Sequence, residues 1–245
     1  MSDGASALRD ATARILPLWK AAFTGEGERR QRHQRRMALA WAAACRYRTY
    51  LDIALEERRM WGERLISNLA PEGAAGRATD EWLAERGDLE LRTHYAIECF
   101  FLFSKILLDR VALAIRETFG HARDFEPSHG ALLKESTGLR AFAQQHRIEP
   151  PPRELLAQAR QLEDVTSFRD HQIVHPTNVR HGRVTQLIPT TGEVDVLVGV
   201  HMPKDGESPP AESPIIAEVV PLLDEYLAGV SSWVAKCLAE LAESS

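Results

Sequence analysis

The sequence predicts a mainly helical protein, a bundle of about five to seven helices with one β-hairpin inserted before the C-terminal helix. Two observations predict this fold class. Apolar residues recur near the 3.6-residue period of an α-helix over most of the chain, whereas residues 178–203 alternate between apolar and polar. The 245 residues are 44% hydrophobic and 27% charged, as in ordinary globular proteins. We expect residues 1–245 to form one domain.

Two helices are expected at the N-terminal end. The first covers residues 6–23 and ends at the Gly25-Glu26-Gly27-Glu28 break, because closely spaced glycines interrupt a helix. The second runs over residues 29–69 with apolar residues at helical spacing. Its first turns, residues 29–36, are polar on every side, so we expect this basic helix end to protrude into solvent.

Three helices are expected in the middle of the chain. A short one begins after Thr79 or Asp80, since either residue can cap a helix N-terminus. The next, over residues 88–119, is the expected central helix and has Gly120 as its C-terminal cap. A third helix is predicted over residues 130–146.

The C-terminal third combines helices with the hairpin. Three prolines at 150–152 precede a helix predicted over residues 153–174, because proline is tolerated in the first turn. In the hairpin of residues 178–203, Pro189-Thr190-Thr191-Gly192 separates two alternating runs. Helical spacing returns over residues 215–243, the predicted C-terminal helix.

Five arginines gather at the start of the second helix: Arg29, Arg30, Arg32, Arg35 and Arg36. The formal net charge of the chain is -5, so a polyanion site would have to come from such a local basic patch. We take these arginines as candidate RNA-binding residues. A solvated helix end is the other interpretation of the same run.

The chain is expected to be cytoplasmic and to lack a membrane-spanning segment. Residues 1–10 show no basic start followed by an apolar run, so secretion is not indicated. The most apolar stretch is residues 95–115. Charged residues interrupt it at positions where each would be costly in a bilayer: Glu98, Lys105, Asp109 and Arg110.

The segment with the most suggestive chemistry is Phe168-Arg169-Asp170-His171-Gln172-Ile173-Val174-His175-Pro176. In a continuous helix, Arg169 and His175 would lie about 9 Å apart along the axis and on different faces. Pro176 disfavours helical torsions at His175, so the helix should end near Val174 and let His175 turn toward Arg169. A histidine can move protons near neutral pH, and an arginine can hold phosphate oxygens. The pair therefore suits cleavage of RNA by its own 2′-hydroxyl, which needs neither a metal nor another cofactor.

This segment resembles the signature of HEPN domains, in which a polar residue follows the arginine and a histidine lies a few positions beyond. Here five residues lie between Arg169 and His175. The apolar stretch that holds Tyr95, residues 99–103 and residues 105–109 also resembles the aromatic-rich helix of bacterial HEPN-like proteins. The resemblance covers a HEPN-like core of residues 88–176.

The resemblance implies an all-helical bundle, a homodimer that brings two motifs together, and metal-independent endoribonuclease activity in toxin–antitoxin or phage-defence systems. It implies RNA as a partner, together with an antitoxin or another protein. Arg169 and His175 take the catalytic positions, and Asp170 takes the polar position beside the arginine. The hairpin departs from the simplest family pattern, which leaves the subfamily open.

Two alternative hypotheses involve the same segment. In the first, Arg169 pairs with a carboxylate of the bundle, Glu98 or Asp109, and the chain is a non-catalytic HEPN-like module that binds a nucleotide or a protein. In the second, His171 and His175 bind a metal ion in a helical-bundle metalloenzyme, with His94, His181 or Asp170 completing the ligands. Gln172 stands where a helical zinc hydrolase would carry its glutamate base, which disfavours the metal hypothesis.

Overall fold

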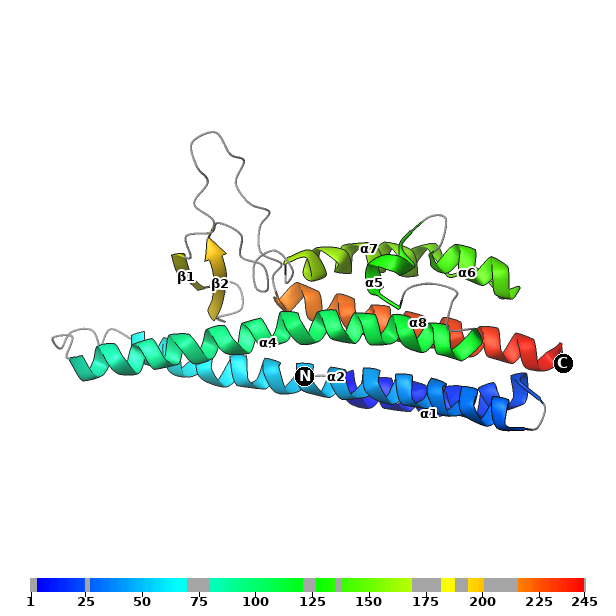
Figure 1. Cartoon of the computed structure of the whole chain (residues 1–245). Coiled ribbons are helices and arrows are strands. Elements are labelled where there is room, and N and C mark those ends of the chain that lie inside the picture. Colours follow the sequence, from blue (N-terminus) through cyan, green and yellow to red (C-terminus); the bar gives the residue numbers. More distant parts are fainter. Residues whose placement is uncertain are drawn as a thin grey trace, which may run out of the picture. The chain divides into compact units, whose positions relative to one another are not determined.

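The computed structural model describes residues 4–24, 27–69, 80–120, 127–134, 138–168, 182–187, 194–200 and 216–244 (Figure 1). Within these ranges the chain is mainly helical, which confirms the helical part of the predicted fold class. The helices are α1 (Gly4–Ala22), α2 (Glu28–Leu69), α4 (Asp80–Phe119), α5 (His129–Leu132), α6 (Leu139–His146), α7 (Arg153–Phe168) and α8 (Ile216–Glu243). The strands are β1 (Gly182–Leu187) and β2 (Val194–Val200).

The two strands pair antiparallel, with Gly182 opposite Val200 and Leu187 opposite Val194. The register shifts between Gly182 and Val184, as at a β-bulge. Residues 188–193, which connect the strands, lie outside the described residues. The hairpin as a unit of residues 178–203 therefore stays a prediction.

The central helix is longer than predicted. Instead of a short helix followed by another from residue 88, α4 is continuous from Asp80 to Phe119 and passes through Gly87. A lone glycine costs a helix only about 1 kcal/mol relative to alanine, and ion pairs one turn apart flank this one. Arg86 pairs with Glu90, and Arg92 with Asp88. The Arg86–Glu90 pair spans Gly87, and α4 continues through this glycine.

The helix predicted over residues 130–146 is instead two short helices, α5 and α6. Ser128 caps α5 by accepting a hydrogen bond from the Ala131 amide, and α6 starts after Gly138. A Cβ atom at Gly138 would lie 2.2 Å from the Lys134 carbonyl oxygen, so the backbone approaches itself closely there. This close approach between α5 and α6 requires a glycine, and the helical pattern alone did not reveal it.

The chain forms two compact units. One contains residues 1–50, 103–165 and 217–245, and the other contains residues 51–102 and 166–216. The long helices α2 and α4 each contribute residues to both units.

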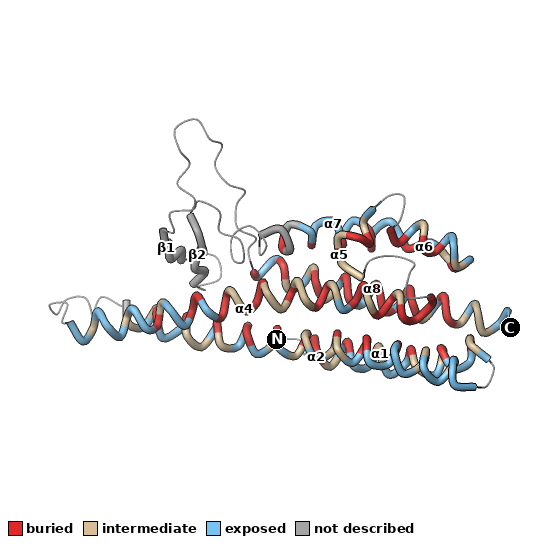
Figure 2. Tube along the Cα trace, viewed as in Figure 1, coloured by how far each residue is buried: buried red, intermediate tan, exposed pale blue. Residues whose placement is uncertain are grey.

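In the first unit, α1 and the first half of α2 lie on one side of α4 and α8, and α5, α6 and α7 lie on the other side (Figure 1). Side chains join these layers. The Trp19 indole of α1 donates to the Thr118 carbonyl of α4 at 2.9 Å, and the rings of Phe119 and Trp233 join α4 to α8. Buried residues gather between the layers (Figure 2), and the layered core includes Trp19, Trp41, Val111, Ile115, Leu162, Val230 and Leu238.

In the second unit, α2 and α4 bury Leu51, Leu65 and Ile97. The ring of Trp61 on α2 carries two guanidinium groups at cation–π distance. Arg64 lies 4.9 Å and Arg92 lies 4.6 Å from its centroid. Since Arg92 belongs to α4, this stack joins the two helices of the unit.

Candidate functional site

The predicted catalytic residues Arg169, Asp170 and His175, together with His171, lie outside the described residues. The last described residue before them is Phe168, where α7 ends. Their convergence therefore stays a prediction, and so does the helix over residues 169–174. The structure describes the contacts that hold α7 in place and the surroundings of the five arginines.

A buried histidine connects the central helix to α7. His129 is fully buried, and its Nε2 lies 2.8 Å from the carbonyl oxygen of Ala159 on α7. A carbonyl only accepts, so Nε2 carries the proton of the neutral ring. Burial lowers the pKa of His129 below its ordinary value, because the imidazolium form would lose its hydration. At pH 7 the neutral His129 ring therefore links α5 to α7 through this hydrogen bond.

Asp109, one of the two carboxylates proposed as partners for Arg169, holds the start of α5. Its Oδ1 accepts hydrogen bonds from Lys105 Nζ at 3.1 Å and from the His129 backbone amide at 2.8 Å. Glu98, the other candidate, is half-buried on α4 in the second unit, and His94 on the same helix is buried. Asp109 thus holds the start of α5 against α4. The pairing of either carboxylate with Arg169 stays a prediction.

The five arginines at the start of α2 divide into two groups. Arg29, Arg32 and Arg35 are exposed and have no carboxylate partner among the described residues, although Arg32 Nε contacts the Glu28 carbonyl at 3.4 Å. Arg30 and Arg36 turn toward the bundle and are hydrogen-bonded there. The sequence showed one basic cluster, but the fold uses part of it and leaves the rest in solvent.

Arg30 caps the end of α1. Its Nε donates to the Phe23 carbonyl at 2.6 Å, and its Nη2 donates to the Lys20 carbonyl at 3.0 Å. The last carbonyls of a helix lack intrahelical partners and carry the negative end of the helix dipole. The Arg30 guanidinium donates hydrogen bonds to these carbonyls and places a positive charge at the negative end of the dipole. The group also lies over the Trp19 ring, 5.8 Å from its centroid.

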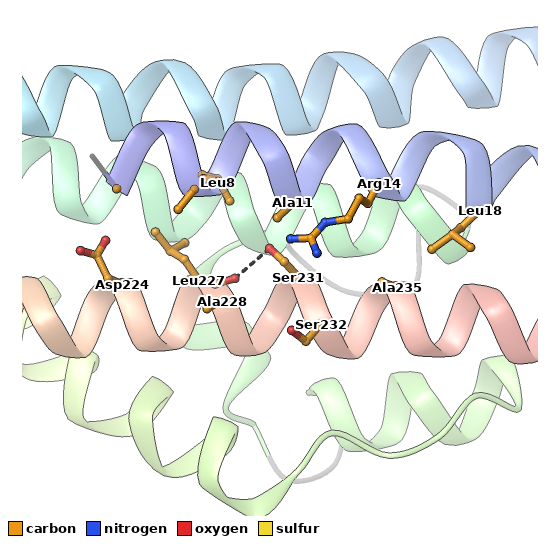
Figure 3. Close-up of a pocket in the computed structure, with 12 residues that line it drawn as sticks. Leu8, Ala11, Arg14, Leu18, Asp224, Leu227, Ala228, Ser231, Ser232 and Ala235 are labelled. Carbon is orange, nitrogen blue, oxygen red and sulfur yellow. Dashed lines mark hydrogen bonds between the residues drawn. The ribbon is translucent and has the colours of Figure 1, made fainter. Parts of the chain in front are cut away.

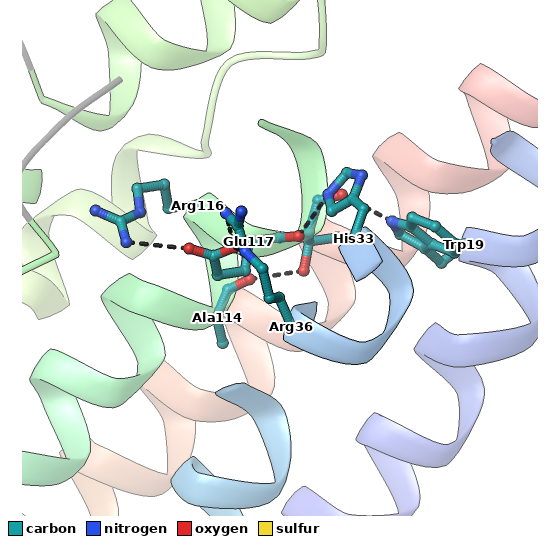
Figure 4. A network of polar contacts seen from close by, with 7 residues as sticks. Trp19, His33, Arg36, Ala114, Arg116 and Glu117 are labelled. Atoms are coloured by element: carbon teal, nitrogen blue, oxygen red, sulfur yellow. Dashed lines mark hydrogen bonds and ion pairs between the residues drawn. The ribbon is translucent and has the colours of Figure 1, made fainter. Parts of the chain in front are cut away.

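Arg36 and His33 hold the end of α4, as Figure 4 shows. Arg36 binds the carboxylate of Glu117 through Nε at 2.7 Å and also through Nη2, while Arg116 reaches its other oxygen at 3.0 Å. His33 Nε2 lies 2.8 Å from the Glu117 carbonyl oxygen, and its ring stands edge-on to Trp19. The Glu117 side chain is only 7% exposed, so two arginines compensate one nearly buried charge.

These contacts define a basic face at the start of α2, made of Arg29, Arg32 and Arg35. The three lie within about one third of the helix circumference, since each step of three residues turns the helix back by about 60°. The neighbouring carboxylate of Glu117 is already bound by two arginines. Glu28 lies on the same face, but within the described part of the chain no ion pair joins it to the three arginines. The basic face therefore keeps a net positive charge and suits a polyanionic phosphate backbone.

In comparisons with known proteins, no protein-family model, no curated protein and no solved structure matches the chain. Among the helices in the described part of the chain, none is long and apolar enough to cross a membrane. The same ranges contain no cluster of three or more His, Cys, Asp or Glu side chains suited to hold a metal ion. His171 and His175, the proposed metal ligands, lie outside those ranges.

Sequence reasoning missed Glu117, which decides how the arginine cluster is used. A signal existed in part: Glu117 is an acid in the last turn of α4, where the helix dipole favours basic residues. An acid in that position needs cations from elsewhere, but only the fold identifies Arg36 as the one that reaches it.

Proposed function

We propose that the chain binds RNA through the basic face and cleaves it in a HEPN-like, metal-independent reaction. One observation carries the binding part of the proposal. Arg29, Arg32 and Arg35 are exposed on one face of a helix whose start is tied down by Arg30 and Arg36. Exposed arginines that have no carboxylate partner among the described residues are suited to phosphates, because no internal ion pair has to break before binding.

The chemical part rests on Arg169 and His175 and their place directly after α7. A base removes the proton of a ribose 2′-hydroxyl, and its oxygen then forms a bond to the adjacent phosphorus. The bond from phosphorus to the 5′-oxygen breaks, and that oxygen takes up a proton from an acid. His175 serves as acid or base, and the Arg169 guanidinium stabilises charge on the phosphoryl oxygens. The product carries a 2′,3′-cyclic phosphate.

Cleavage is tested with purified protein, a single-stranded RNA and a chelator. We expect cutting to persist in the chelator and the products to carry a 2′,3′-cyclic phosphate. His175→Ala and Arg169→Ala should each remove most of the activity while leaving the melting temperature unchanged. Full cleavage by His175→Ala would refute the assignment, and loss of wild-type cleavage on chelation would favour the metalloenzyme.

Binding is tested separately, by titrating the His175→Ala protein with labelled RNA over a series of salt concentrations. Each phosphate contact contributes about 0.7 to the slope of log affinity against log salt for single strands. Replacing Arg29, Arg32 and Arg35 together by glutamine should therefore reduce that slope by about two. The exposed Arg46 on the same helix provides the matched control, and Arg46→Gln should leave the slope unchanged.

The two experiments separate the proposal from its non-catalytic alternative. Specific RNA binding through the basic face, without cleavage by the wild-type protein, would indicate a binding module. If replacing Arg29, Arg32 and Arg35 leaves RNA affinity and its salt dependence unchanged, the proposed interface is refuted, whatever the outcome for catalysis.

A further inference from the structure

A hollow of about 490 Å³ lies between α1 and α8 in the first unit (Figure 3). Its walls are mainly apolar and carry small side chains, such as Ala11 on α1 and Ala228 on α8, between the larger Leu8, Leu18 and Leu227. This volume lies within the range of small-molecule sites, which are typically apolar pockets with a few polar groups. None of the residues discussed for RNA lies in it.

An ion pair lies at one end of the hollow, where Gly4 and Asp224 line it. Arg48 is almost completely buried and binds the carboxylate of Asp224 through Nε at 3.1 Å and through Nη2 at 3.0 Å. Gly4 lies directly against this guanidinium, since a Cβ atom there would be 1.9 Å from Arg48 Nη2. Arg48 thus compensates the charge of Asp224, and the pair gives this end of the hollow no net charge.

Arg14 is the polar group that remains. It is exposed, has no carboxylate partner within the described ranges, and directs its guanidinium into the hollow toward Ser231 (Figure 3). The Ser231 hydroxyl is buried and donates to the Leu227 carbonyl at 2.8 Å, so its oxygen can still accept another hydrogen bond. An uncompensated cation within an apolar wall calls for an anionic group attached to an apolar body.

The dimensions favour a chain-like molecule over a protein segment. From Gly4 to Leu18 the α1 wall is about 21 Å long, at 1.5 Å per residue. A partner helix about 10 Å across and as long as this wall would occupy on the order of 1,600 Å³. That is several times the volume of the hollow, which is about 490 Å³. From Arg14 to Gly4 the wall is about 15 Å long, which suits one extended hydrocarbon chain.

We propose that the hollow between α1 and α8 binds a medium-chain fatty carboxylate. Its carboxylate pairs with Arg14, and its chain runs along Leu8 and Leu227 toward the end lined by Gly4. This site is separate from the proposed RNA site and does not depend on it.

The test is calorimetric titration of the full chain with decanoate below its micelle concentration, with octanoate and decanol as comparison ligands. We expect one decanoate per chain, bound about tenfold more tightly than octanoate, because two further methylenes are buried. Decanol should bind at least tenfold more weakly than decanoate, since it lacks the charge that pairs with Arg14.

Matched variants decide whether the hollow is the site. Arg14→Ala should weaken decanoate binding about tenfold and abolish the preference over decanol, whereas the control Arg46→Ala should change neither. Ala228→Trp fills the hollow and should abolish binding, and Ala217→Trp, exposed on the same helix, should not. Circular dichroism verifies that each variant is folded.

Three results would overturn the proposal. The first is the absence of saturable decanoate binding to the folded wild-type chain. The second is equal affinity of wild type and Arg14→Ala for decanoate. The third is a dimer in analytical ultracentrifugation that Ala228→Trp dissociates, because the hollow would then be covered by a second copy of the chain.

Discussion

Replacing Arg36 by alanine tests the division of the arginine cluster most directly. The change removes two hydrogen bonds from the Glu117 carboxylate, which is 7% exposed, and leaves only Arg116 to compensate it. Removing one partner of a buried ion pair costs about 3–5 kcal/mol. Half of the Arg36 side chain is exposed and Arg116 remains in place, so water screens much of the loss. We therefore expect about 1–2 kcal/mol of lost stability.

The assay is thermal and urea unfolding of Arg36→Ala beside Arg35→Ala, its exposed neighbour. A loss of 1–2 kcal/mol corresponds to about 3–6 °C in melting temperature for a chain of this size. Arg35→Ala removes a solvated side chain, so its effect on stability should stay within about 0.5 kcal/mol. RNA affinity should show the reverse pattern, with Arg35→Ala weakening binding and Arg36→Ala changing it less.

A double-mutant cycle with Glu117→Gln isolates the contact itself. If the two side chains interact as the structure indicates, the coupling energy between Arg36→Ala and Glu117→Gln should be about 1 kcal/mol. Equal stability losses for Arg35→Ala and Arg36→Ala, or a coupling energy near zero, would refute the division of the cluster into structural and exposed arginines.

Four further predictions concern the scaffold. Gly87→Ala should stabilise the chain by about 0.5–1 kcal/mol, because Gly87 is helical and has open space at its Cβ position. Gly138→Ala should lower the free energy of unfolding in urea by about 1–3 kcal/mol, because its Cβ atom would meet backbone atoms. Burial lowers the pKa of His129, so the neutral ring stabilises the fold above the ordinary histidine pKa, and this stabilisation declines below about pH 6.5. Between pH 7.5 and 5.5 the melting temperature should therefore fall more for the wild type than for His129→Gln. Thr118→Val removes the acceptor of the Trp41 indole, 3.0 Å away, and should cost about 1–3 kcal/mol by tryptophan-monitored unfolding; an unchanged midpoint would refute that bond.

The bounds of α1, α2 and α8 were largely predictable because they depend on local signals. Apolar residues at helical spacing run through each of them, and the observed ends lie within a few residues of those expected. The errors occurred where a local signal competed with context. The boundary expected before residue 88 is absent, because α4 continues through Gly87, where the Arg86–Glu90 pair spans the glycine. The break before Gly138 depends on a backbone contact that no spacing reveals.

The candidate sites depend still more on the fold. The sequence by itself determined a mainly helical chain with one arginine cluster and one Arg-His segment, because residue type and spacing along a helix are local properties. Only the tertiary structure decided that Arg30 and Arg36 hold helix ends and that Arg29, Arg32 and Arg35 do not. The physical reason is that an arginine either pairs with a group of the protein or stays free to bind a ligand, depending on which groups the fold brings near it. Glu117, which pairs with Arg36, lies 81 residues away along the chain.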